Sequence, residues 1–325
     1  MSSTTTLRGG FGPAAGPAPG GADTALIAAD GRHLAATWHE PPAGPARAVA
    51  VVSSAAGVPR GYYRAFAGWL AARGAAVLTY DYRGIGGSRR GPLRAETANM
   101  ADWAVLDMSA ALSGAEARRG TLGLPLLLVG HSFGGGGIGL ASGVERADAI
   151  LAVASQLGES RLFPGPYRWL AAGFLRGWIP AVVAVAGHLP GPALGPGAMA
   201  LPPGVARQWS RWSGTRGWAY GDPTLRRHRS ASAVVAPVHL WNVSDDLTYA
   251  PPRAVDALAA QFRNAPVQRH TATPADAGLR RLGHFGAFRR EAGVRLWSRL
   301  MAPLERASPA LARALASPTA PPPAS

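Results

Sequence analysis

The chain lacks two residue types altogether: none of its 325 residues is cysteine or lysine. Without cysteine there is no thiolate nucleophile, disulfide, iron–sulfur cluster or cysteine-bound zinc. Without lysine there is no Schiff-base amine, P-loop lysine or kinase lysine. The nucleophile of an enzyme with this sequence must therefore be the side chain of Ser, Thr, Asp, Glu, Tyr or His.

Because lysine is absent, all 33 positive side chains are arginine, and against 18 Asp and Glu they give a formal net charge of +15. Such a charge is compatible with binding to nucleic acid or to an anionic surface. No stretch of arginine is interleaved with aromatic residues as in an RNA-binding surface. The joint rise of Ala, Arg, Gly and Pro is more typical of a genome-wide codon bias, and we expect no nucleic-acid partner.

The bulk composition indicates a globular protein. Hydrophobic residues make up 47% of the chain and charged residues 16%, which is too apolar and too lightly charged for a disordered chain. Residues 1–21 lack the apolar segment of a signal peptide. The longest apolar run, Gly177–Gly187, has 11 residues, too few to span a bilayer. We therefore expect a cytoplasmic enzyme.

Segments that read as strands alternate with segments of helical spacing along most of the chain. The expected strands are Thr24–Ala29, Leu34–Trp38, Ala48–Ser53, Ala75–Tyr80, Pro125–Val129, Asp148–Ala154, Val238–Val243 and Val267–Thr271, and the expected helices include Tyr62–Arg73, Asn99–Ser113, Arg253–Phe262 and Ala287–Leu300. This alternation predicts an α/β fold, with a mostly parallel sheet flanked by helices.

The alternation stops in one central region. Residues 158–230 are rich in Trp, Pro and Gly, and we interpret them as an inserted cap short of regular structure. The core of the fold is then made of two parts, residues 23–157 and 231–307. Residues 1–22 and 308–325, which are Ala-, Pro- and Ser-rich, are expected to be flexible tails.

A G-x-S-x-G motif follows directly on one of the apolar strands. It consists of Gly130, His131, Ser132, Phe133 and Gly134. Ser132 is expected on a sharp turn between strand and helix, where the two glycines leave room because they lack a Cβ atom. His131 is expected to face away from Ser132. The N–H of Phe133, at the start of the helix, is expected to point to where an oxyanion would form.

Two other readings of this motif are weaker. An incidental serine in a glycine-rich turn would not need the apolar strand that precedes it. A dinucleotide-binding loop would need an acidic residue at the end of the next strand. The only acid of that strand, Asp148–Ala154, stands at its start. The motif therefore favours Ser132 as a nucleophile.

A serine nucleophile needs a base and the base an orienting acid, and on this kind of sheet they follow in the order Ser, Asp or Glu, His. Asp245 and Asp246 stand just past one expected strand, and His284 stands past the last one. We therefore predict a catalytic triad of Ser132, Asp246 and His284, with Asp245 as the alternative acid. His270, at the end of the last expected strand, is the alternative base.

With these motifs the chain resembles the α/β-hydrolase superfamily, and more narrowly bacterial serine hydrolases with a Ser aminopeptidase-like core. The similar segments are residues 55–63, the D-x-R-G-x-G-x-S loop at 81–88, the motif at 130–134, Asp245–Asp246 with 250–252, and 283–288 with 296–297. The resemblance spans residues 24–301. It implies an α/β-hydrolase fold, a serine hydrolase of esterase, lipase or peptidase type, and a structural role for Asp81 and Arg83.

One departure from the family pattern concerns the second oxyanion donor. Where such proteins usually have His-Gly after the third strand, this chain has Ser-Ala-Ala-Gly at residues 54–57. From its spacing to Tyr63 we choose the N–H of Ala56 as the second donor, beside that of Phe133. The N–H of Ala55 is the alternative.

The cap carries five of the ten tryptophans. Four of them, Trp169, Trp178, Trp209 and Trp212, are candidate walls of a hydrophobic acyl pocket. The alternative is that they build a small core of the cap itself.

The sequence thus predicts a serine hydrolase that acts on a small-molecule acyl substrate through an acyl-enzyme, without a cofactor or a metal ion. The alternatives are an acyltransferase with the same triad and a catalytically silent hydrolase-fold binding protein. The cap holds nine arginines against two acids. That charge is expected to attract an acidic or phosphate-bearing substrate, and contact with an anionic membrane is a less favoured use of it.

Overall fold

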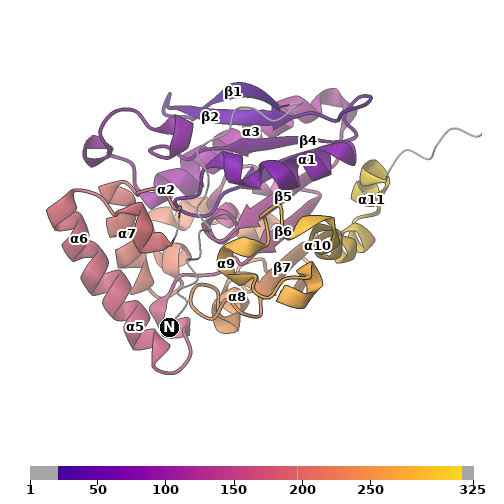
Figure 1. The fold of residues 1–325 in the computed structure, drawn as a ribbon. Helices are drawn as coiled ribbons and strands as arrows, with labels where there is room; N and C mark the ends of the chain where they lie inside the picture. Colours follow the sequence, from indigo (N-terminus) through magenta and orange to yellow (C-terminus); the bar gives the residue numbers. More distant parts are fainter. Residues whose placement is uncertain (1–20, 196, 317–325) are drawn as a thin grey trace, which may run out of the picture.

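A computed structural model describes residues 21–195 and 197–316, which form a sheet of eight strands with helices on both faces (Figure 1). The strands are β1 (Gly21–Ile27), β2 (His33–His39), β3 (Ala48–Ser53), β4 (Ala75–Tyr80), β5 (Leu126–His131), β6 (Ala149–Val153), β7 (Val238–Val243) and β8 (Val267–Ala272). They lie in the order β1-β2-β4-β3-β5-β6-β7-β8. The pairs β1–β2 and β2–β4 are antiparallel and all others are parallel, which confirms the predicted α/β fold.

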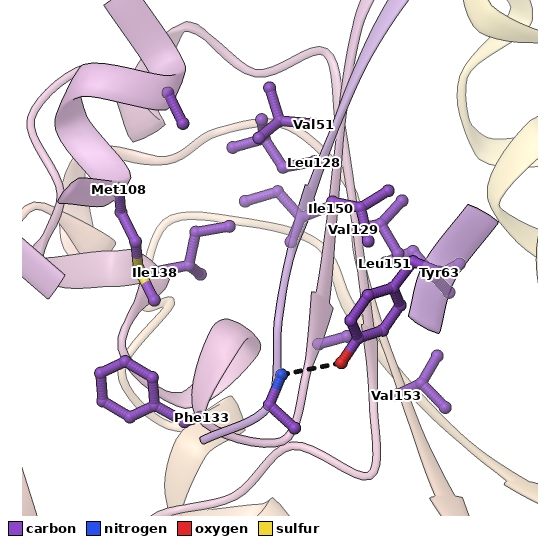
Figure 2. Close-up of a cluster of buried hydrophobic side chains, with 14 of the residues drawn as sticks. Val51, Tyr63, Met108, Leu128, Val129, Phe133, Ile138, Ile150, Leu151 and Val153 are labelled. Atoms are coloured by element: carbon purple, nitrogen blue, oxygen red, sulfur yellow. Dashed lines mark hydrogen bonds between the residues drawn. The ribbon is translucent and has the colours of Figure 1, made fainter. Parts of the chain in front are cut away.

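The central strands are buried on both faces, as expected for parallel strands covered by helices. Figure 2 shows how their alternating side chains serve the two faces. Met108, at the start of α3 (Met108–Arg119), lies on one side of the sheet, and Tyr63, just before α1 (Arg64–Ala72), lies on the other. α10 (Gly293–Ala307) packs beside α1.

The remaining core helices are short. They are α2 (Met100–Asp102), α4 (Phe133–Gly136), α8 (Pro252–Ala259), α9 (Gly283–Gly286) and α11 (Pro309–Leu315). The expected helix 287–300 begins later, as α10, because Gly293 has a positive φ of 61° that a helix interior does not allow.

The predicted C-terminal tail is wrong over part of its length. Residues 309–315 form α11, and Leu311 and Leu315 are fully buried. Arg47 donates hydrogen bonds to the carbonyl oxygens of Ala314 and Ala316, which ties this end of the chain to the core. The other tail residues, 1–20 and 317–325, lie outside the described residues, and β1 already begins at Gly21.

The segment between β6 and β7, hereafter the insertion (residues 158–230), holds more regular structure than expected. α5 (Tyr167–Gly173), a π-helical turn and α6 (Ile179–Ala186) form one continuous helix of 20 residues, Tyr167–Ala186. α7 (Pro203–Ser213) packs between α6 and the core (Figure 1). By length and composition the continuous helix is apolar enough to cross a membrane. The estimate from uninterrupted apolar runs is therefore wrong, because the helix continues through its two arginines.

Candidate active site

The predicted nucleophile stands on a strained turn between β5 and α4. Ser132 has φ 53° and ψ −117°, a conformation that non-glycine residues rarely adopt. Two glycines allow the chain to pass so closely here. A Cβ atom on Gly134 would lie 2.0 Å from the carbonyl oxygen of Ser53, and one on Gly130 would lie 2.4 Å from the backbone of Gly135. The turn is therefore held by backbone-to-backbone contact with β3.

The three predicted triad residues come together past the carboxyl ends of the parallel strands β5, β7 and β8. Ser132 Oγ lies 2.8 Å from His284 Nε2, and His284 Nδ1 lies 2.6 Å from Asp246 Oδ2. Each of the three residues is buried, with 4–8% of its surface exposed. Since a carboxylate only accepts, Nδ1 carries the proton and Nε2 is free to accept one from the serine hydroxyl. The arrangement has the geometry of an activated serine nucleophile.

The two neighbouring aspartates have separate places. Asp246 reaches the imidazole of His284 with one oxygen and accepts the N–H of Tyr249 with the other. Asp245 instead accepts the backbone N–H groups of Leu282 and Gly283, at 3.0 and 2.8 Å. It thereby fixes the backbone that carries the histidine.

The alternative base is not at this site. His270 stacks on Trp241, and its Nε2 lies 3.0 Å from Nδ1 of His239. Its ring belongs to a contact between β7 and β8, so the structure brings His284 and not His270 to Ser132.

One of the two candidate oxyanion donors of the β3 loop is already in use. The N–H of Ala55 donates to the hydroxyl of Tyr63 at 2.8 Å, the bond drawn dashed in Figure 2. The N–H groups of Ala56 and Phe133 have no acceptor among the described residues, and both residues line the cavity next to Ser132. The two N–H groups without an acceptor among the described residues are those chosen from the sequence as oxyanion donors.

A buried hydrogen-bond chain that sequence reasoning missed connects the three loops of the site. The Tyr63 hydroxyl lies 2.8 Å from His131 Nδ1, and His131 Nε2 lies 2.9 Å from the carbonyl oxygen of His284. Because that carbonyl only accepts, Nε2 carries the proton, and Nδ1 accepts from the tyrosine. Burial lowers the pKa of His131 to about 3, so the ring stays neutral.

A small cavity, partly open to solvent, lies over Ser132. Its walls are mostly apolar and aromatic, as in sites for hydrophobic ligands. The lining residues are Ala55, Ala56, Met100, Ser132, Phe133, Gln156, Gly158, Leu194, Trp209, Trp218, Tyr249, His284 and Phe285. Trp209, Trp218 and Leu194 come from the insertion.

Of the four tryptophans predicted to line a pocket, only Trp209 lines this cavity, and the expectation is wrong for the other three. Trp169 and Trp178 are 69% and 44% exposed, on the continuous helix of the insertion. Trp212 is fully buried and donates its N–H to Asp222 at 2.8 Å, so it belongs to the core of the insertion. Trp218, which was not among the four, takes a place in the wall.

The D-x-R-G loop has the structural role that the family resemblance implies. Arg83 pairs with Asp107 at 2.7 Å and with Asp30 at 2.6 Å. Asp81 pairs with Arg60 and accepts the N–H of Gly87. None of these side chains lines the cavity next to Ser132.

Comparison with known proteins agrees with this architecture. Residues 44–194 match the family model "Serine aminopeptidase, S33". A search of curated protein sequences gives no match.

Many solved structures share the fold. A soluble variant of monoglyceride lipase from Saccharomyces cerevisiae, in complex with a substrate analogue, is similar with a TM-score of 0.60 and 14% identity, over 85% of this chain and 92% of the lipase. An esterase from Pyrococcus furiosus is similar with a TM-score of 0.54 and 14% identity, over 89% and 93%. Brefeldin A esterase, a bacterial homologue of human hormone-sensitive lipase, gives 0.55 and 14%, over 90% and 77%. The solved structures show that the chain has the α/β-hydrolase fold, and its residues 44–194 are similar to a serine aminopeptidase family.

Proposed function

We propose that the protein hydrolyses an ester, thioester or amide of a small molecule with a hydrophobic acyl group, through an acyl-enzyme on Ser132. The observation that carries this proposal is the unbroken chain of hydrogen bonds from Ser132 through His284 to Asp246, with distances of 2.8 and 2.6 Å, at the wall of an apolar cavity. The two solved relatives named as esterases and the one named as a lipase favour an ester among the three bonds.

In the proposed reaction, Ser132 Oγ attacks the acyl carbonyl carbon while His284 Nε2 accepts the hydroxyl proton. The oxygen that becomes negative accepts hydrogen bonds from the N–H groups of Phe133 and Ala56. His284 then gives its proton to the leaving alcohol, thiol or amine. Water repeats the sequence on the acyl-enzyme, and Asp246 stabilises the imidazolium in both halves.

The substrate preference follows from the walls of the cavity. Trp209, Trp218 and Leu194 cover it from the insertion, which acts as a cap, and Met100 and Phe285 lie in the core part of the wall. Burial of an acyl chain against these side chains is favourable in proportion to its apolar area. Turnover is therefore expected to rise with acyl length until the chain fills the cavity.

The test is turnover of p-nitrophenyl esters of increasing acyl length, with labelling by a fluorophosphonate probe. Ser132→Ala is expected to lose both turnover and labelling. Ser160→Ala, which changes another buried serine outside the cavity lining, is the control expected to keep both. Equal labelling of the wild type and Ser132→Ala would refute the nucleophile.

The same experiment separates the alternatives. An acyl-enzyme that accumulates without turnover, and is released by an added alcohol or amine, would indicate an acyltransferase on this site. A wild type that neither labels nor turns over any ester would indicate a binding protein with the hydrolase fold.

A further inference from the structure

The continuous helix of the insertion, Tyr167–Ala186, has one buried and one exposed side. Leu175, Ile179 and Val183 are buried, at the spacing of one helix face, and pack toward α7. Figure 1 shows α5 and α6 along the outer edge of the insertion, with α7 between α6 and the rest of the molecule. The opposite side of the helix therefore faces away from the core.

This outer side is apolar, which is unusual for a surface. Eleven large hydrophobic residues are exposed in the described parts of the chain, and six of them belong to this helix. They are Tyr167 (47% exposed), Trp169 (69%), Leu170 (67%), Phe174 (37%), Trp178 (44%) and Val185 (91%), and we call them the apolar face. Phe174 and Trp178 stack with their ring centroids 5.1 Å apart. Tyr167, Leu170, Phe174 and Trp178 recur at the i, i+3 and i+4 spacing of one helix side, and an exposed apolar stripe of this kind marks a surface for a partner.

The charges around the apolar face indicate what that partner is. The insertion has only two acids, and both are paired within it: Glu159 with Arg161, and Asp222 with Arg211. Arg168 and Arg176, on the helix itself, pair with no carboxylate of the described residues. The guanidinium of Arg168 lies 4.9 Å from the ring centre of Trp169. Unneutralised arginines beside Trp, Phe and Leu are typical of helices that bind anionic lipid surfaces.

The same residues decide how such a helix would lie. Arg176 stands at its middle, where a spanning helix would carry a charge at the centre of the bilayer. Its buried seam is already committed to the rest of the insertion, so the helix is not free to leave. A helix with one seam packed on protein and an apolar face outward can lie in the plane of the lipid–water interface.

We propose that the helix Tyr167–Ala186 docks the protein onto an anionic lipid bilayer, with the apolar face in the interface and Arg168 and Arg176 at the lipid headgroups. The inference goes beyond the proposed function and does not depend on Ser132. Docking would place the bilayer on the outer side of this helix, whose inner side packs on α7, and α7 carries Trp209 in the wall of the cavity.

The test is co-sedimentation of the full chain with vesicles of phosphatidylcholine alone and of phosphatidylcholine with 30 mol% phosphatidylglycerol, whose negative surface attracts arginine. The wild type is expected to bind the anionic vesicles and to release as salt is added. The variant Trp169→Ser/Trp178→Ser is expected to lose at least about tenfold in partition coefficient, because it removes two aromatic anchors. Arg168→Gln/Arg176→Gln is expected to bind anionic vesicles less than the wild type does, and to bind vesicles of phosphatidylcholine alone as the wild type does.

The matched control is Ile27→Ser/Val235→Ser, which removes two residues that are 64% and 69% exposed elsewhere on the surface. Its binding is expected to equal that of the wild type. Turnover of a soluble ester, or thermal unfolding if none is found, reports that each variant is folded.

Three results would overturn the proposal. The wild type fails to bind anionic vesicles at low salt, or the tryptophan variant binds them as well as the wild type does. The third result is that the wild type does not bind vesicles and is a dimer in sedimentation equilibrium, while the tryptophan variant is a monomer. A second copy of the chain would then cover the apolar face.

Discussion

Replacement of each neighbouring aspartate by asparagine should separate chemistry from support. In Asp246→Asn, one amide must serve both His284 Nδ1 and the N–H of Tyr249, which lie at 2.6 and 3.1 Å from the two carboxylate oxygens. If the amide oxygen faces Tyr249, the NH₂ group faces Nδ1, and the proton moves to Nε2, which then cannot accept from Ser132. If the oxygen faces Nδ1, the charge that stabilises the imidazolium is still lost.

Either orientation is expected to lower kcat by about 10⁴-fold, near 5.5 kcal/mol of transition-state stabilisation, with little change in KM. Asp245→Asn is expected to behave differently. Its two oxygens each accept one backbone N–H of the histidine loop, and the amide can accept only one of them. The expected loss is about 1–3 kcal/mol in the free energy of unfolding, with a decrease in kcat of about tenfold or less.

The assay is steady-state turnover of the best p-nitrophenyl ester, with urea unfolding of both variants. A kcat of Asp246→Asn within tenfold of the wild type would refute the role of Asp246. Equal kcat losses in both variants would refute the division of roles between the two aspartates.

Three further predictions concern buried polar groups. Tyr63→Phe leaves the N–H of Ala55 and Nδ1 of His131 buried without their partner, so the free energy of unfolding in urea should fall by about 2–4 kcal/mol and kcat should decrease. A variant as stable as the wild type would contradict the buried chain of hydrogen bonds. Trp212→Phe, which loses the bond to Asp222, should be about 1–3 kcal/mol less stable than Trp218→Phe, whose indole N–H has no acceptor among the described residues; the reverse order would contradict the assignment. Burial lowers the pKa of His131 to about 3, below an unfolded value near 6.5, so the unfolded state takes up a proton first as the pH falls from 6.5 toward 3. The free energy of unfolding should therefore decrease over this pH range, by up to about 1.4 kcal/mol per pH unit. His131→Asn should reduce this pH dependence of stability, and an unchanged pH dependence would contradict the role given to His131.

The sequence was informative where a local pattern has one structural solution. The apolar run before Gly130 and the glycine at 134 predict a sharp turn in which the backbone passes close to a neighbouring strand. In the structure Gly134 lies so close to Ser53 that a Cβ atom would not fit between them. Ser132, Asp246 and His284 each follow the end of an expected strand in the sequence, in the order that such a triad requires. The parallel sheet brings these ends together, so side chains far apart in sequence meet at 2.6–2.8 Å.

The sequence was misleading where an apolar residue lies on the surface. Trp169 and Trp178 fit the rule that large rings fill a core or pocket, yet they are exposed, because the buried seam of their helix is made of smaller aliphatic side chains. Arg176 interrupts the apolar run and hid the length of the helix. At the C-terminus, the i, i+4 spacing of Leu311 and Leu315 was a usable signal within a segment whose composition resembles a linker.

The hydrogen bonds of Asp245 needed tertiary structure. Two adjacent aspartates past a strand are equivalent in sequence, and only the fold shows that one reaches a ring while the other reaches two backbone amides. The same holds for Tyr63, whose hydroxyl lies between two loops separated by more than seventy residues along the chain.

The strained backbone of Ser132 has a consequence for how the protein can change. A non-glycine residue at φ 53° costs about 1–3 kcal/mol, and alanine keeps most of that strain while glycine relieves it. The position at which the hydroxyl is required is therefore one at which the fold itself would prefer glycine. A lineage released from the need for catalysis would gain stability by replacing this serine with glycine, so the residue that performs the proposed chemistry is also one that drift toward a more stable chain would remove.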